Sequence, residues 1–280
     1  MKRTRSACLV GILAFCCLLS AAFADEGPLD TSQPKGITSD EIMQRFAAKE
    51  KEFKEAYDQY GYRESAKMQT LDGDTVDGEF QEVFDVSFDD QGRRVKNVVF
   101  APLSTLVRLG MTREDYDDLE NGFPMVLTSD DINQYNVLYV GQQQEDELHC
   151  YVFDIAPKQI EKNKRYFQGR IWVDDHDFQI VKTYGQMVPE TRAKKGRGNE
   201  NLFPKFTTWR EQIDNKYWFP TYTRADDTLR FSTGDVKIRE IVKYENYKRF
   251  GSKVKITYEG KEVQKGTGTD QNAKPQPPQQ

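Results

Sequence analysis

Four consecutive polar residues, Asp174-Asp175-His176-Asp177, form the densest group of candidate metal ligands in the chain. Three carboxylates and an imidazole could bind a divalent cation, and a bound cation could activate water for hydrolysis. The group lies between two apolar segments, 171–173 and 178–181, where a tight turn also favours Asp. We therefore interpret it as a hairpin turn and predict no metal site, with a metal-dependent hydrolase as the enzymatic alternative.

A second candidate is His149, which precedes Cys150 and could suggest a thiol nucleophile. Adjacent residues of a strand point to opposite faces of a sheet, so this imidazole cannot activate this thiol. The neighbouring residues 151–153 (YVF) predict a buried thiol that behaves as a small hydrophobe. Serine nucleophile elbows, Walker loops and paired zinc-ligand motifs do not occur in the sequence. We predict no catalytic residues and no cofactor.

Two further segments resemble binding motifs but lack required features. Residues 72–78 (DGDTVDG) begin like a calcium loop, yet Val76 occupies the fifth position and Asp77 the position of the invariant glycine. Residues 192–198 (RAKKGRG) form the one basic run, without interleaved aromatic residues. A solvated hairpin loop explains this run best, with contact to anionic lipid head groups as the weaker alternative. The net charge of −5 further argues against nucleic acid as a partner.

The first 24 residues have the features of a secretory signal peptide. A basic start at residues 2–5 precedes an apolar run, and Ala22-Phe23-Ala24 offers small residues at the two positions that a signal peptidase reads. We predict cleavage after Ala24 and a periplasmic location, in preference to an uncleaved membrane anchor. Cleavage moves the net charge from −5 to −8, because three cations and no anions leave. It also leaves Cys150 as the single cysteine, so no internal disulfide is predicted.

Helical patterning is confined to two segments. Thr38-Ser39-Asp40-Glu41 contains a capping box, and apolar residues recur near helical spacing from there to Tyr57. The polar side of this helix is mixed rather than basic, so we expect it to pack on a sheet and not on a lipid surface. Residues 112–121 predict a second, brief helix. This helix falls within an apolar segment, residues 102–127, that interrupts the predicted strands. The segment is either a lid or plug over one face of the sheet or a plain connection.

Alternation of apolar and polar residues predicts about ten antiparallel strands. Three follow the helix, between residues 60 and 101, and three or four more fill residues 135–187. Others cover 206–213, 218–225 and 236–247, with a further candidate at 253–258. Because a twisted sheet of this size tends to curl, we predict a mainly β (α+β) fold. Its curled antiparallel sheet is a half-open barrel whose concave face is covered by a few helices.

Aromatic residues make up 12% of the chain, and many fall in the predicted strands. The segment 148–155 is largely apolar on both faces, so each face needs cover from protein or from a ligand. Core packing explains any single aromatic residue, while their number predicts an apolar ligand cavity. The predicted lining residues are Tyr139, Tyr151, Phe153, Ile171, Trp172, Trp209 and Trp218.

Three short motifs resemble a known family. Residues 148–158 (LHCYVFDIAPK), a strand that ends in Pro-Lys, are similar to the central strand of the LolA-like outer-membrane lipoprotein-sorting proteins. Residues 170–174 (RIWVD) followed by 179–182 (QIVK) resemble the Trp-x-Asp hairpin of that family, and 217–220 (YWFP) resemble its late strand. The resemblance spans nearly all of the chain after the signal peptide.

The resemblance implies a half-open barrel that holds acyl chains in an apolar cavity under a helical lid. It implies a monomeric periplasmic carrier of lipid or lipoprotein acyl chains, with an inner-membrane export complex and an outer-membrane acceptor as partners. The lipidated cysteine of the anchored acceptors is missing here, and the family's lid-closing arginine matches no particular position. Because the superfamily also contains periplasmic regulators, a sensor that signals through a protein partner is the alternative function.

The sequence thus divides into four predicted parts. Residues 1–24 are the signal peptide and 25–37 a flexible linker rich in Pro, Gly and Ser. Residues 38–263 form a single half-barrel domain. Residues 264–280 are a disordered tail rich in Pro and Gln.

Overall fold

The described part of the chain contains one long helix, α1 (Ser39–Tyr57). In this computed structural model, Thr38 caps the helix by accepting a hydrogen bond at Oγ1 from the backbone N–H of Glu41, at 3.1 Å. Ile42, Phe46 and Phe53 are fully buried along one side of the helix, while its charged side remains in solvent. The helix predicted from the capping box and the apolar spacing is therefore confirmed.

The structure describes residues 26–250 except 90, 111–126, 163, 190, 193–199 and 202. The predicted signal peptide, the brief helix at 112–121, most of the basic run, the candidate strand at 253–258 and the tail lie outside these residues. Within the described residues, no helix has the length and apolar character needed to cross a membrane.

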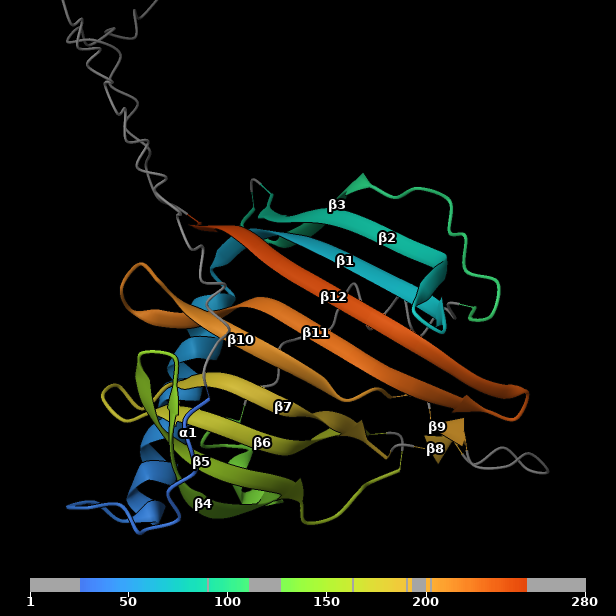
Figure 1. The fold of residues 1–280 in the computed structure, drawn as a ribbon. Coiled ribbons are helices and arrows are strands. Elements are labelled where there is room, and N and C mark those ends of the chain that lie inside the picture. The colour runs from blue at the N-terminus through green and yellow to red at the C-terminus, as the bar shows by residue number, and fades with distance from the viewer. Residues whose placement is uncertain are drawn as a thin grey trace, which may run out of the picture. The chain divides into compact units, whose positions relative to one another are not determined.

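The strands form one antiparallel sheet in the order β3-β2-β1-β12-β11-β10-β7-β6-β5-β4, with the short strands β8 and β9 beside β11 (Figure 1). The bounds are β1 (Tyr60–Asp72), β2 (Thr75–Phe88), β3 (Arg94–Phe100), β4 (Tyr135–Glu145), β5 (Leu148–Pro157), β6 (Tyr166–Asp174), β7 (Ile180–Val188), β8 (Thr191–Arg192), β9 (Glu200–Asn201), β10 (Phe206–Ile213), β11 (Tyr217–Phe231) and β12 (Gly234–Arg249), with a 3-10 turn η1 (Ile132–Gln134) before β4. Because β3 and β4 are edges that do not pair with each other, the curled sheet is not closed. The mainly β, half-barrel fold class is confirmed.

Several hairpins turn at residues that tolerate a left-handed backbone. Gly73 lies between β1 and β2 with a φ of 61°, and Asp146 lies between β4 and β5 with a φ of 51°. Asp214 and Asn215 join β10 to β11, each with a φ of 53°. Asp, Asn and Gly adopt these angles at low energetic cost, so the sequence itself fixes where consecutive strands reverse.

Side chains of β5 alternate between two differently covered faces. Tyr151, Phe153 and Ile155 pack into a core cluster with α1, and we call this side of the sheet the helix face. Cys150 and Val152 point to the other side, which we call the outer face, and pack there in a separate small cluster. Figure 1 shows α1 running behind β5, β6, β7 and β10.

The C-terminal half of α1 is fixed to the sheet by aromatic rings and by one ion pair. The Tyr57 ring meets the Phe219 ring edge-on, with centroids 5.4 Å apart. Arg210 on β10 donates two hydrogen bonds to the carboxylate of Glu50, at 2.7 and 3.3 Å. Both partners of this ion pair are almost completely buried, so α1 has one defined position along the helix face.

The first described residues run along the edge of β4. Gly27 N–H donates to the Gln144 carbonyl at 2.9 Å, and Asp30 exchanges two backbone hydrogen bonds with Gln142, at 2.8 and 2.7 Å. We predicted a flexible linker at 25–37 from composition, but residues 26–30 are held by backbone groups that an edge strand leaves unpaired. The other domain boundaries stay predictions.

Candidate functional site

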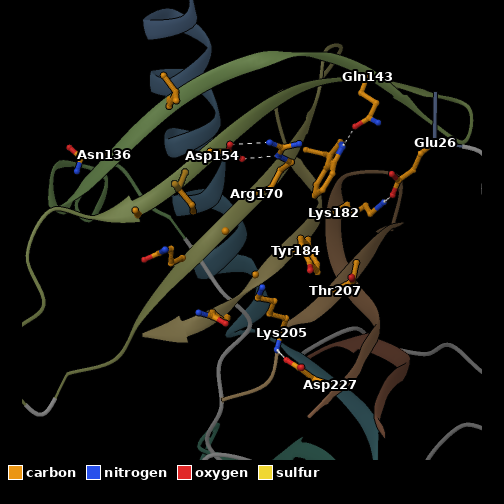
Figure 2. A pocket seen from close by; sticks show the side chains of 18 of the residues that line it. Glu26, Asn136, Gln143, Asp154, Arg170, Lys182, Tyr184, Lys205, Thr207 and Asp227 are labelled. Carbon is orange, nitrogen blue, oxygen red and sulfur yellow. Dashed lines mark hydrogen bonds and ion pairs between the residues drawn. The ribbon is translucent and has the colours of Figure 1, made fainter. Parts of the chain in front are cut away.

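A cleft of about 1390 Å³ opens on the outer face (Figure 2). Its walls come from β4, β5, β6, β7, β10 and β11, together with Glu26 from the N-terminal segment. β10 pairs with β7 only over Phe206–Trp209, and Gln186 of β7 and Asp227 of β11 line the cleft beyond this short contact. The volume of the cleft exceeds that of a typical small-molecule pocket.

Apolar and aromatic side chains line part of the cleft. Leu138 on β4 has 65% of its surface exposed and Tyr184 on β7 has 45% exposed. Trp172 on β6 is nearly buried, and its indole N–H donates to Gln143 Oε1 at 2.9 Å. A ligand in the cleft would therefore meet one fixed aromatic wall and two exposed apolar side chains.

The charged residues at the middle of the cleft are paired with each other. Arg170 donates to both oxygens of Asp154, at 2.7 and 3.0 Å, and this hydrogen bonding raises the pKa of the guanidinium. Figure 2 shows the two hydrogen bonds between Asp154 and Arg170. Because the pair is neutral as a unit, it orients the polar wall without adding net charge.

One end of the cleft contains a buried ammonium. Lys182 on β7 is only 4% exposed, and its Nζ donates to Glu145 Oε1 at 2.6 Å and to Glu26 Oε1 at 2.5 Å. The Trp172 ring lies 4.7 Å from the same nitrogen and the Trp209 ring 5.9 Å away. Burial raises the pKa of Glu145, against the lowering effect of its hydrogen bond to Lys182. The Glu145 Oε2 atom is buried without a hydrogen-bond partner.

The opposite end of the cleft is more exposed. Lys205 lies just before β10, and its backbone N–H donates to Asp227 Oδ2 at 2.9 Å (Figure 2). Arg230 on β11 and Thr207 on β10 complete this end. The cleft thus has a buried, fixed end at Lys182 and a solvated end at Lys205.

The seven predicted cavity residues are divided between the two faces of the sheet. On the helix face, Tyr139, Tyr151, Phe153 and Ile171 pack in or against the core cluster beneath α1. On the outer face, Trp172 lines the cleft, Trp209 lies behind Lys182, and Trp218 packs beside the β6–β7 turn. The structure does not bring the seven together, and their role in ligand binding stays a prediction.

The polar cluster at the β6–β7 connection forms a turn, as predicted. Asp174 Oδ2 accepts hydrogen bonds from the backbone N–H groups of His176 and Asp177, at 3.2 and 2.9 Å. Asp177 in turn accepts a hydrogen bond from the indole N–H of Trp218, at 2.8 Å. Among the described residues, no group of three potential metal ligands was found. The buried thiol of Cys150 is also confirmed, and its burial raises its pKa well above the usual value.

The sequence analysis missed the ion cluster of Lys182, Glu145 and Glu26. Nothing in the local sequence marks Lys182 as buried, because an isolated lysine in a strand normally indicates a solvated face. Its partners lie 37 and 156 residues away in the chain, so only the folded sheet brings them together.

No protein-family model matches this chain, and no curated protein matches it. Solved structures similar to it include a DUF1329 family protein from Desulfovibrio piger, at 16% identity over 70% of this chain and 87% of that chain, with a TM-score of 0.33. A LolA superfamily protein from Nitrosomonas europaea matches at 15% identity over 72% and 93%, with a TM-score of 0.29. The Pseudomonas aeruginosa MucA/MucB complex matches at 9% identity over 75% and 98%, with a TM-score of 0.21.

The solved neighbours therefore include a member of the superfamily that the sequence motifs resemble. With identities of 16% or less and TM-scores of 0.33 or less, they identify neither a ligand nor a partner for this chain.

Proposed function

We propose that this chain is a periplasmic binding protein that shields an acyl chain of a lipid or lipoprotein in the outer-face cleft during outer-membrane lipoprotein sorting. The observation that carries the proposal is the cleft of about 1390 Å³ with exposed Leu138 and Tyr184 beside the fixed Trp172 wall. Exposed apolar side chains in a concave site favour an apolar ligand. Each buried methylene contributes about 0.8 kcal/mol, so a single acyl chain supplies ample affinity.

The periplasmic location rests on the predicted signal peptide, and the carrier role on the LolA-like motifs together with the cleft. In this proposal the chain binds its ligand without covalent chemistry. An inner-membrane complex would supply the acyl chain and an outer-membrane acceptor would receive it.

Native mass spectrometry of the protein purified from its periplasm tests the proposal. We expect bound lipid or acylated peptide in the natural protein and its loss in Leu138→Asp, which places a charge in the cleft. Ile160→Asp is the matched control, because Ile160 is also exposed, at 51%, but does not line the cleft. Consistently empty protein that also fails to bind added acyl compounds would contradict the proposal.

A second candidate function, a regulatory module that binds a protein partner, is favoured by the edge strand β3. Val98, Val99 and Phe100 are 59%, 51% and 49% exposed there, and β3 pairs with β2 alone among the described strands. An extended segment of a partner could add to such an edge as a further strand. Stoichiometric co-purification of one protein, lost in Phe100→Asp while lipid retention persists, would support this function.

A further inference from the structure

Lys182 stands out because it is the one lysine among the buried residues in the described part of the chain. A buried ammonium needs partners, and here it has two carboxylates, those of Glu145 and Glu26. The cluster therefore carries one negative charge in excess. A structural ion pair requires only one carboxylate for one ammonium.

The two carboxylates are held very differently. The Glu145 side chain is 5% exposed and belongs to β4, while the Glu26 side chain is 53% exposed. Glu26 belongs to the N-terminal segment, which contacts β4 through isolated bridges at Glu26 and Asp30. Glu145 is thus the buried partner of Lys182, and Glu26 is its solvent-exposed partner.

The position of Glu26 faces the cleft. Glu26, Lys182 and Trp172 all line it, and Figure 2 shows the Glu26 carboxylate reaching the Lys182 ammonium at its upper end. An ammonium has three N–H donors, and two are directed at the carboxylates. A negatively charged group that enters through the cleft would meet Lys182 at the place where Glu26 now lies.

We propose that Lys182 anchors the anionic head group of an amphiphile whose acyl chain lies in the cleft, and that this head group replaces the Glu26 carboxylate. This inference rests on the proposed function and narrows its ligand class to acyl chains with a carboxylate or phosphate head. Exchange of one carboxylate for another anion keeps the hydrogen bonds of Lys182 and leaves the Glu145 pair intact. The acyl chain of the bound amphiphile then extends past Trp172 toward Tyr184 and Leu138.

Calorimetric titration with four compounds of one chain length tests the head-group site: laurate, lauryl phosphate, lauryl alcohol and laurylamine. We expect laurate and lauryl phosphate to bind more tightly than the alcohol, and the tighter of the two identifies the natural head as carboxylate or phosphate. The Glu26 carboxylate competes with the ligand head group for Lys182 at a millimolar effective concentration. Glu26→Gln removes this competitor, so the affinity for laurate and lauryl phosphate should rise about tenfold. The affinity for lauryl alcohol should stay unchanged.

Two variants separate the head-group site from general effects. Lys182→Met combined with Glu145→Gln removes the ammonium without leaving a buried charge unpaired, and the preference for anions over the alcohol should disappear. Glu41→Gln is the matched control for Glu26→Gln, because Glu41 is an exposed carboxylate in a 2.5 Å ion pair with Arg45, outside the cleft. Its titrations should match those of the natural protein.

Three other results would contradict the inference, and each has a different meaning for the proposed function. Equal binding of laurate and the alcohol, unaffected by Glu26→Gln, would overturn the head-group site and leave the acyl-binding function standing. Tightest binding of laurylamine would overturn it as well, because the excess negative charge would then be the ligand site. If none of the four compounds binds, both the inference and the proposed function fail.

Discussion

Two buried ion clusters on opposite faces of the sheet differ in their access to solvent. On the helix face, the Glu50 carboxylate pairs with Arg210, and the two side chains are only 1% and 2% exposed. On the outer face, Lys182 pairs with both the buried Glu145 and the half-exposed Glu26. The first cluster is buried between α1 and β10, whereas Lys182 and Glu26 of the second line the cleft.

The difference favours the outer face as the one that binds a ligand in our proposal. A buried ion pair between two elements, here α1 and β10, holds them in one position and is not in contact with solvent. A cluster with a surplus, partly solvated carboxylate can exchange that carboxylate. The family resemblance implied a cavity beneath the helices, yet the helix face is filled by α1 and the described cleft is on the other side.

Removing one member of the closed pair should have the largest effect on stability. Glu50→Ala leaves the Arg210 guanidinium buried without its carboxylate, so we expect a loss of about 3–5 kcal/mol in the free energy of unfolding. Urea denaturation followed by circular dichroism measures it. Glu50→Leu with Arg210→Met removes both charges and should recover most of the loss. A loss below about 1 kcal/mol for Glu50→Ala would show that the pair stabilises the fold no more than a surface salt bridge does.

The buried carboxyl of Glu64 extends the comparison of buried charged groups, because its burial should make the stability of the protein depend on pH. Glu64 lies on β1 and is 5% exposed, and burial raises its pKa to about 7. Lys96 and Arg94 lower this pKa, whereas Glu240 and Glu82 raise it. Between pH 4.5 and about 7, the folded protein therefore holds a proton at Glu64 that the unfolded chain releases.

The sign of the pH effect follows from these two values. Stability from protonated Glu64 is complete below pH 4.5 and is lost as the pH rises through about 7. Glu64→Gln should remove this dependence, and at pH 8 it should be more stable than the natural protein by roughly 2–3 kcal/mol. Denaturation midpoints between pH 5 and 8 measure the effect, with Glu41→Gln as the exposed control. Parallel pH profiles for the natural protein and Glu64→Gln would contradict it.

The smallest change in stability should come from Glu26→Gln. Its carboxylate is half exposed, and Lys182 keeps its buried partner Glu145, so the expected loss is below about 1 kcal/mol. The same urea experiment measures it beside Glu50→Ala. A loss as large as that of Glu50→Ala would make the two clusters structurally equivalent and remove the basis for carboxylate exchange.

Local sequence features predicted the elements well. The strand predicted at 236–247 falls within β12 because apolar and polar residues alternate along much of it, as in Val236-Lys237-Ile238-Arg239. The capping box located the start of α1, and Asp174 to Asp177 marked the turn after β6. Such features act within a few residues of one another, so they can be read without knowledge of the fold.

The cleft could not be predicted in this way. Alternation shows that Phe153 and Val152 point to opposite faces, but it does not show which face α1 covers. Lys182 pairs across the sheet with Trp172, next to a register shift between Trp172 and Val173. Its burial depends on this register and on a segment 156 residues away. Register and long-range contacts are properties of the assembled sheet, so they cannot be predicted from the sequence of a single strand.

The open sheet leaves the protein with two edges that differ in their protection. The edge of β4 is covered in part by the chain's own residues Glu26 and Asp30, which bridge to Glu145 and Gln142. The edge at β3 carries exposed Val98 and other apolar residues, and unpaired strand edges of this kind promote association between molecules. The N-terminal segment therefore covers part of an edge that would otherwise be open to association. We expect a chain that begins at residue 38 to expose this second edge and to self-associate more strongly at high protein concentration.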